Sequence, residues 1–191
     1  MATQYIWEDY VTIGDDLFFP GVMSCAAIIV LANGTLDYGG YHITRYSTQT
    51  ELQAACQYML NQLNGNVTAV YVIGNYQRYN CSGVGANGGL ATALRNALNY
   101  NGNVRFLQSS SNWMTNGIAV RAENSGVITG ALELRIAAPG NWSVGGNANL
   151  SLVMREVRPN GNVINPRIAS RQTASFNGTE NPWLLGALDV A

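Results

Sequence analysis

Two residues that together could perform nucleophilic chemistry lie close in this sequence: Cys25 and His42, the only histidine of the chain. Between them an apolar run, Ala26 to Ala32, precedes Asn33-Gly34, a pair that tolerates positive φ and is typical of a tight hairpin turn. A strand returning through Tyr41-His42-Ile43 would bring the imidazole beside the thiol. Because the thiolate is the nucleophile and a neighbouring imidazole activates it, this arrangement predicts thiolate catalysis.

Cys25 also has a purely structural interpretation. Cysteine is among the most often buried residues, and one at the start of an apolar strand commonly belongs to the core. The only histidine of the chain, expected beside Cys25, favours acid–base catalysis there instead. The residues by themselves leave both interpretations open.

Length and charge restrict the classes of protein to consider. With 191 residues and no internal repeat or clear boundary, residues 1–191 fit one domain. Charged residues make up only 11% and the net charge is −1, so a nucleic-acid partner would lack its usual basic surface. All ten basic residues are arginine. This absence of lysine reflects either compositional drift or selection against ubiquitin attachment in a host cytosol.

The sequence carries no expected targeting segment, metal site or cofactor site. The first fourteen residues include Glu8 and Asp9 but no arginine, and no apolar run approaches the roughly 18 residues of a membrane span. Three cysteines cannot all pair internally, which suits a reducing compartment or a free thiol. One histidine and no Cys-x-x-Cys pair are too few zinc ligands, and Gly83 to Gly88 matches a dinucleotide motif without the strand context that motif needs.

Hydrophobic periodicity predicts a mixed α/β (α+β) layer, a mixed β-sheet with two main helices packed on one face. Thr48 and Glu51 have the spacing of a capping box at the start of the first helix, whose apolar face includes Cys56 as a core residue. The second helix is expected over residues 88–98. The expected strands are 10–13, 26–32, 41–43, 67–73 and 104–108, followed by hairpins over 118–122 with 127–136 and 150–157 with 163–170.

Two short motifs resemble those of a known family. Met23-Ser24-Cys25-Ala26-Ala27-Ile28 and Gly39-Gly40-Tyr41-His42-Ile43 resemble the Gly-Ser-Cys and Gly-Gly-x-x-His motifs of CheD, the bacterial chemoreceptor glutamine deamidase. The second motif is one residue shorter here, and Met23 stands where the family has glycine. The resemblance covers about residues 8–136 and implies a CheD-like deamidase fold. Residues from about 139 to 191 would then be a C-terminal extension with an extra β-hairpin.

The same Cys–His fold is used by bacterial toxins similar to the cytotoxic necrotizing factors and the Burkholderia lethal factor. The resemblance implies that Cys25 attacks the γ-carboxamide of a protein glutamine. His42 would hold the thiolate, then protonate ammonia and activate water. Backbone N–H groups around Ser24 and Cys25 would stabilise the oxyanion.

The resemblance leaves the group that orients His42 open. In CheD a threonine six positions before the cysteine does so, and that position is Phe19 here. A backbone carbonyl, as in the necrotizing factors, or the hydroxyl of Thr12 or Thr44 would serve instead. Tyr41, the neighbour of His42, joins Ser24, Thr44 and Phe19 as an expected support residue.

The resemblance thus implies a protein glutamine deamidase that releases ammonia, or a transglutaminase if an amine replaces water. Its partner would be a glutamine of a host protein, with no nucleic acid, membrane or cofactor. It would act as a monomeric virulence effector, secreted or delivered into the host cytosol without a signal peptide; otherwise it would be cytoplasmic. Two alternatives remain: another cysteine hydrolase, such as a peptidase or amidase, and a non-catalytic binding module in which Cys25 and His42 are structural.

Overall fold

The computed structural model describes residues 4–44, 47–74, 87–108, 118–124, 132–137, 142–144, 154–157, 163–167, 174–176 and 187–190. Within these residues the chain forms two helices and three β-sheets. The predicted mixed α/β architecture is therefore confirmed, and the strands and helices follow the expected order along the chain.

The two larger sheets are both mixed. The first has eight strands among the described residues, in the order β12 (Val163–Arg167), β11 (Met154–Val157), β2 (Tyr10–Gly14), β5 (Tyr38–Ile43), β4 (Ala26–Ala32), β6 (Val67–Gly74), β7 (Val104–Gln108) and β14 (Ala187–Val190). The second has four in the described part, in the order β1 (Gln4–Tyr5), β3 (Asp16–Val22), β8 (Ile118–Asn124) and β9 (Leu132–Ala137). A small third sheet pairs β10 (Trp142–Val144) with β13 (Ala174–Phe176). The β6–β7 and β1–β3 pairs are parallel, and the other strand pairs described are antiparallel.

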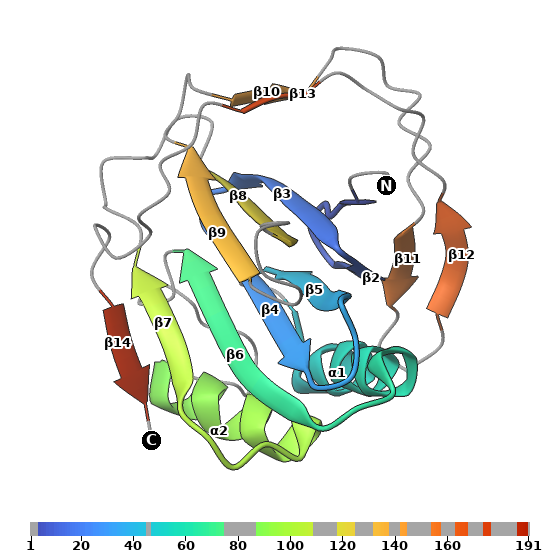
Figure 1. Ribbon diagram of the computed structural model, residues 1–191, viewed down its shortest axis with the longest axis vertical. Helices are drawn as coiled ribbons and strands as arrows, with labels where there is room; N and C mark the ends of the chain where they lie inside the picture. Colours follow the sequence, from blue (N-terminus) through green and yellow to red (C-terminus); the bar gives the residue numbers. More distant parts are fainter. Residues whose placement is uncertain are drawn as a thin grey trace.

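The eight-stranded sheet is the middle layer of the molecule. Helices α1 (Gln49–Leu63) and α2 (Asn87–Leu98) pack side by side on one of its faces, and the four-stranded sheet covers part of the other face (Figure 1). The sequence predicted helices on one face, which is confirmed. It did not predict the second sheet on the opposite face, since it places no strand between residues 13 and 26, where β3 lies.

Strand β4 lies at the centre of this arrangement and is buried on both faces. Ile28 and Val30 face the helices, whereas Ala27 and Ile29 face the second sheet. A strand enclosed in this way needs a continuous apolar run rather than an alternating one, and its β-branched residues suit the extended backbone. The apolar run that separates Cys25 from His42 is therefore the innermost strand of the fold.

The connection from β4 to β5 is longer than the predicted tight turn. Strand β5 begins at Tyr38, opposite Leu31, and Gly34 has a φ of +79°. The loop residue Asn33 is bonded to Asn66: its N–H donates to the Asn66 carbonyl, and its Oδ1 accepts from the Asn66 N–H at 2.8 Å. The loop is thus fastened to the start of β6, which explains why it does not close on two residues.

Helix α1 begins and ends as its sequence predicts. The Thr48 hydroxyl accepts a bond from the Glu51 N–H, and the Glu51 carboxylate accepts one from the Thr48 N–H. Asn64 ends the helix in the left-handed conformation at φ 50°. On the sheet opposite, Gly39 leaves the room that Met59 fills, since a Cβ there would lie 2.7 Å from the Met59 sulfur.

The C-terminal strands extend the large sheet at both edges. Strands β11 and β12 pair with each other, as predicted for an extra hairpin, and β11 also pairs with β2. Strand β14 pairs with β7 at the opposite edge (Figure 1). The expected hairpin of β8 with β9 is present, with β9 beginning at Leu132. Three parts of the sequence analysis lie outside the described residues: positions 83–86 of the glycine motif 83–88, Cys81, and the first residues of the expected strand 127–136.

Candidate active site

Cys25 and His42 come together as the hairpin geometry predicted. Cys25 immediately precedes β4, and His42 lies on β5 opposite Ala27, so the two side chains are diagonal neighbours on one face of the sheet. His42 Nε2 lies 2.9 Å from Cys25 Sγ. This contact is a direct hydrogen bond between the only imidazole of the chain and the thiol.

The other ring nitrogen determines the tautomer of His42. Nδ1 lies 2.8 Å from the backbone carbonyl oxygen of Ile6. A carbonyl oxygen only accepts hydrogen bonds, so Nδ1 must carry the proton and donate it. The lone pair of Nε2 then faces Sγ, which is the orientation that a base for Cys25 requires. The orienting group is thus a backbone carbonyl, one of the alternatives that the sequence left open.

Burial favours the uncharged form of this pair. Cys25 is 1% exposed and His42 is 0% exposed. Desolvation raises the pKa of the Cys25 thiol to about 12, with smaller raising effects from the charges of Glu8 and Asp9. Desolvation lowers the pKa of His42 to about 4, against a smaller opposing effect of the bond to Ile6. Both shifts favour the form of the pair in which the proton is on sulfur and the thiol donates to Nε2.

Acceptors other than His42 also surround the sulfur. Glu8 Oε1 lies 4.0 Å from Sγ, and the Gly21 carbonyl oxygen lies 3.7 Å from it. The backbone N–H groups of Met23 and Cys25 lower the pKa of the thiol, opposing burial. An exposed carboxylate and backbone donors thus act on the sulfur in opposite directions, the first raising its pKa and the second lowering it.

Gly74, at the end of β6, packs directly against the backbone that carries the thiol. A Cβ on Gly74 would lie 2.6 Å from the carbonyl oxygen of Cys25 and 2.9 Å from the side chain of Val22. Its φ of +145° is also unfavourable for other residues. The position of Cys25 therefore depends on a glycine at this point.

Two of the expected support residues lie on opposite faces of the sheet. The ring of Phe19 meets the imidazole of His42 edge to face, with the centroids 6.0 Å apart. Phe19 therefore packs against His42 instead of donating a hydrogen bond to it. Tyr41 faces the helices, on the other side of β5 from His42. Its side chain is not brought to the site.

The two hydroxyl residues predicted near the site lie at its edges. Ser24 is exposed, in the loop that carries Cys25. Thr44 is buried, and its Oγ1 donates to the Asp9 carboxylate at 3.4 Å while its N–H donates to Ser47 Oγ at 2.9 Å. Nδ1 of His42 is bonded to the carbonyl of Ile6, so neither Thr12 nor Thr44 is needed to orient the imidazole.

The sequence did not single out Ile6 or Glu8 as site residues. A backbone carbonyl has no signature in a sequence, and an acid before a turn is common. Cys56 lies on the buried face of α1 and belongs to the core, as predicted, and burial raises its pKa to about 12. Among the described residues, no group of three or more His, Cys, Asp or Glu side chains could hold a metal ion. No helix in the described part of the chain is long and apolar enough to cross a membrane.

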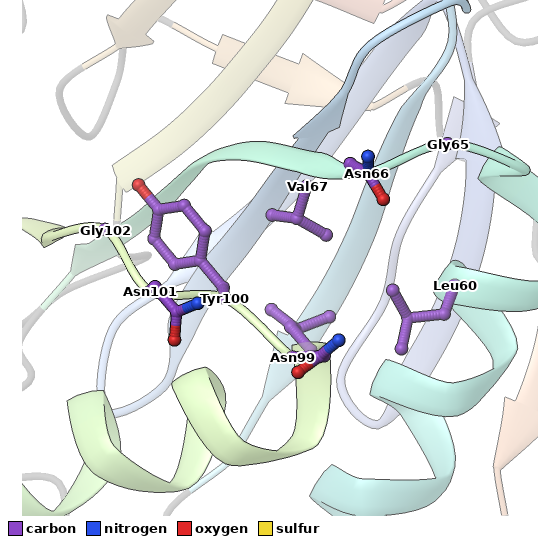
Figure 2. A pocket seen from close by; sticks show the side chains of 9 residues that line it. Leu60, Gly65, Asn66, Val67, Asn99, Tyr100, Asn101 and Gly102 are labelled. Carbon is purple, nitrogen blue, oxygen red and sulfur yellow. The ribbon is translucent and has the colours of Figure 1, made fainter.

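A separate groove of about 530 Å³ lies at the other end of β6, away from Cys25. Figure 2 shows Leu60 of α1 facing Asn99 and Tyr100 across it. Asn99, like the α1 cap residue Asn64, ends its helix with a left-handed φ, here 49°. Asn64 and Asn99 therefore serve to end their helices, and the groove is the space between the turns that follow α1 and α2.

The fold and site together define an α/β protein with a buried, hydrogen-bonded cysteine–histidine pair. No protein-family model matches the chain, and no curated protein matches it in sequence. Its function must therefore be argued from the pair itself and its surroundings.

Proposed function

We propose that this protein is a cysteine-dependent protein glutamine deamidase. The observation that carries the proposal is the 2.9 Å contact between Cys25 Sγ and Nε2 of His42, whose Nδ1 is held by the Ile6 carbonyl. The order of elements along the chain and the two short motifs support it through their resemblance to CheD and the necrotizing factors. A histidine oriented by a backbone carbonyl favours the toxin branch of that resemblance over the chemotaxis branch.

The proposed reaction starts from a neutral pair. As Sγ attacks the γ-carboxamide carbon, His42 Nε2 accepts the thiol proton, so the thiolate forms only when the C–S bond is made. The resulting imidazolium donates that proton to the amide nitrogen, and ammonia leaves as the thioester forms. Nε2 then takes a proton from water, whose oxygen attacks the thioester, and the protonated His42 returns a proton to sulfur. The products are ammonia and glutamate.

Two features of the surroundings bear on this chemistry. Backbone N–H groups of the Met23–Cys25 segment are the candidates to bind the oxyanion, and one such donor contributes about 3 kcal/mol in other enzymes. Because Cys25 is 1% exposed, the glutamine must displace whatever covers Sγ before it reacts. Glu8, an exposed residue 4.0 Å from Sγ, is one side chain that would have to move.

We further propose that the substrate is a glutamine of a host protein and that the protein works as a monomeric bacterial effector in the host cytosol. The absence of lysine supports this setting, since a chain without lysine offers no side chain for ubiquitin attachment. If an amine replaced water at the thioester, the same site would cross-link the glutamine to that amine.

The experiment uses a blocked glutaminyl-glycine dipeptide and measures ammonia release, with hydroxylamine added to trap the acyl-enzyme as a hydroxamate. We expect wild-type turnover to fall at least about 100-fold in Cys25→Ser and in His42→Ala, as removal of nucleophile or base does elsewhere. Cys56→Ser is the matched control, because it removes an equally buried thiol with no imidazole beside it. Turnover that survives Cys25→Ser would refute the proposal.

A non-catalytic role remains the alternative, and the burial of both residues is the observation that favours it. In that case Cys25→Ala would lower the free energy of unfolding and leave binding intact, and the dipeptide would not be turned over. A peptidase or amidase would instead cleave the peptide bond of the dipeptide. The products distinguish the three cases: ammonia, free glycine or neither.

A further inference from the structure

Residues Ile6 to Asp9, here called the strap, lie against His42 from the N-terminal part of the chain. The strap ends in a turn, in which the Tyr10 N–H donates to the Trp7 carbonyl at 3.0 Å. Asp9 occupies the third position of this turn with a φ of +65°. That is the position at which a type II turn requires positive φ and favours glycine.

The strap holds His42 at two points. The Ile6 carbonyl accepts the Nδ1–H of the imidazole at 2.8 Å, as described above. The N–H of Asp9 donates to the main-chain carbonyl of His42 at 2.7 Å. One short segment thus bonds both the side chain and the backbone of the same residue.

The first end of the strap is fixed by packing and by the second sheet. The Ile6 N–H donates to the Phe18 carbonyl on β3 at 2.7 Å. The Ile6 side chain is fully buried and occupies the space above Gly40, where a Cβ would overlap it. Gly40 lies two residues before His42 on the same face of β5.

The other end is fixed by the side chain of Asp9. Its Oδ1 accepts a hydrogen bond from Ser47 Oγ at 2.7 Å and one from Thr44 Oγ1 at 3.4 Å. Ser47 and Thr44 are 1% and 7% exposed, and they connect β5 to helix α1. The carboxylate therefore ties the turn to Thr44 and Ser47, which lie between His42 and helix α1.

The residue type at position 9 suits both the turn and the anchor. Glycine fits φ near +65° best, and aspartate is among the few other residue types that are enriched there. Unlike glycine, aspartate also supplies a carboxylate, and its remaining conformational cost is offset by what that carboxylate binds. The two hydroxyl donors that converge on its carboxylate supply that offset.

We propose that Asp9 is a positioning residue for His42: its carboxylate anchors the strap, and the anchored Ile6 carbonyl keeps the imidazole in the Nδ1–H tautomer with Nε2 facing Cys25. The catalytic meaning of this role rests on the proposed deamidase function. The positioning itself is a statement about the cysteine–histidine pair and has its own measurement.

Because His42 is the only histidine, its ring nitrogens can be followed by NMR in protein labelled with ¹⁵N-histidine. We expect wild type to show one tautomer, with Nδ1 protonated and Nε2 free. The test variant is Asp9→Gly, which suits the positive φ and removes only the carboxylate. Loss of the fixed carbonyl should change the tautomer ratio by about two- to tenfold towards Nε2–H, the effect of one lost hydrogen bond. Dipeptide turnover should fall about 100-fold, as it does when a catalytic group shifts by about 1 Å.

Two further variants serve as controls. Asp9→Asn keeps an acceptor oxygen and tolerates positive φ, so it should restore most of the wild-type tautomer. Glu51→Ala removes another carboxylate that accepts a hydrogen bond, from Thr48 at the start of α1, and should destabilise the fold without changing the tautomer.

A folded Asp9→Gly protein that keeps the single Nδ1–H tautomer would overturn the proposal. If Asp9→Gly does not fold, Ser47→Ala removes the shorter of the two bonds to the carboxylate, and an unchanged tautomer there would overturn it equally. A changed tautomer in a protein whose wild type does not turn over the dipeptide would support the strap and refute the deamidase. Wild-type turnover of the dipeptide, together with an unchanged tautomer in the variant, would support the deamidase and refute the positioning role of Asp9.

Discussion

Acidification should destabilise this protein through His42, and the size of the effect follows from its burial. The pKa of His42 falls from its ordinary value of 6.5 to about 4 in the folded state. Below pH 6.5 the unfolded chain therefore binds a proton that the folded protein excludes, so stability present above pH 6.5 is lost as the pH falls. At about 1.4 kcal/mol for each tenfold difference in proton affinity, the loss is about 1.4 kcal/mol at pH 5.5 and about 3 kcal/mol at pH 4. Full burial means that solvent does not screen this effect.

The measurement is the free energy of unfolding in urea from about pH 7.5 down to about pH 4, for wild type and for His42→Gln, which does not titrate. No other histidine contributes, so the change in stability above about pH 5.5 reports His42 almost alone. Below that pH the carboxylates also titrate, and subtracting the curve of the variant removes their contribution. A thiolate–imidazolium pair would hold the same single proton in total, so this slope reports that the buried pair excludes a second proton, not which atom carries the first. A wild-type curve that is flat above about pH 5.5, or that has the slope of the variant, would refute the exclusion of that second proton.

Three further substitutions test the surroundings of the pair. Glu8→Gln should lower the pKa of Cys25 by removing a nearby negative charge, and so speed the alkylation of Cys25 at neutral pH by less than about tenfold, because an exposed charge is screened. The alkylation rate of Cys56 should not change. An effect on Cys25 that persists in high salt would contradict this electrostatic cause. Gly74→Ala should lower the free energy of unfolding by about 1–3 kcal/mol because of its unfavourable φ, and by more because its Cβ would press on the Cys25 carbonyl. A stable variant with unchanged alkylation of Cys25 would show that the close packing of Gly74 is not needed. Thr48→Ala should cost about 1 kcal/mol by removing half of the capping box, measured by urea unfolding, and no loss would mean that the cap is satisfied by other groups.

Much of the secondary structure could be predicted because it depends on neighbours in the chain. The capping box at Thr48 and the left-handed Asn64 are local, and both limits of α1 agree with them. The run from Ala26 to Ala32 forms a strand because its β-branched residues suit an extended backbone, and β7 matches its predicted bounds, Val104–Gln108. The approach of Cys25 to His42 was also predictable, since a hairpin brings the two ends of adjacent strands together.

The second sheet was not predictable in the same way. The stretch from Asp16 to Val22 contains Pro20 and Gly21, which are typical of a connection, yet it forms β3. Its strand character comes from its pairing with β8, about a hundred residues further along the chain, and with β1. Only the assembled fold supplies those partners.

By itself, then, the sequence determined which residues could do chemistry and that a hairpin would bring them together, because both depend on residue type and short-range geometry. The tertiary structure decided the rest of the site. It assigned the orientation of His42 to the carbonyl of Ile6, it directed Tyr41 to the opposite face, and it buried the pair so deeply that the uncharged forms of both members are favoured. Burial and the meeting of distant backbone groups depend on how the layers pack, and no spacing along the chain encodes them.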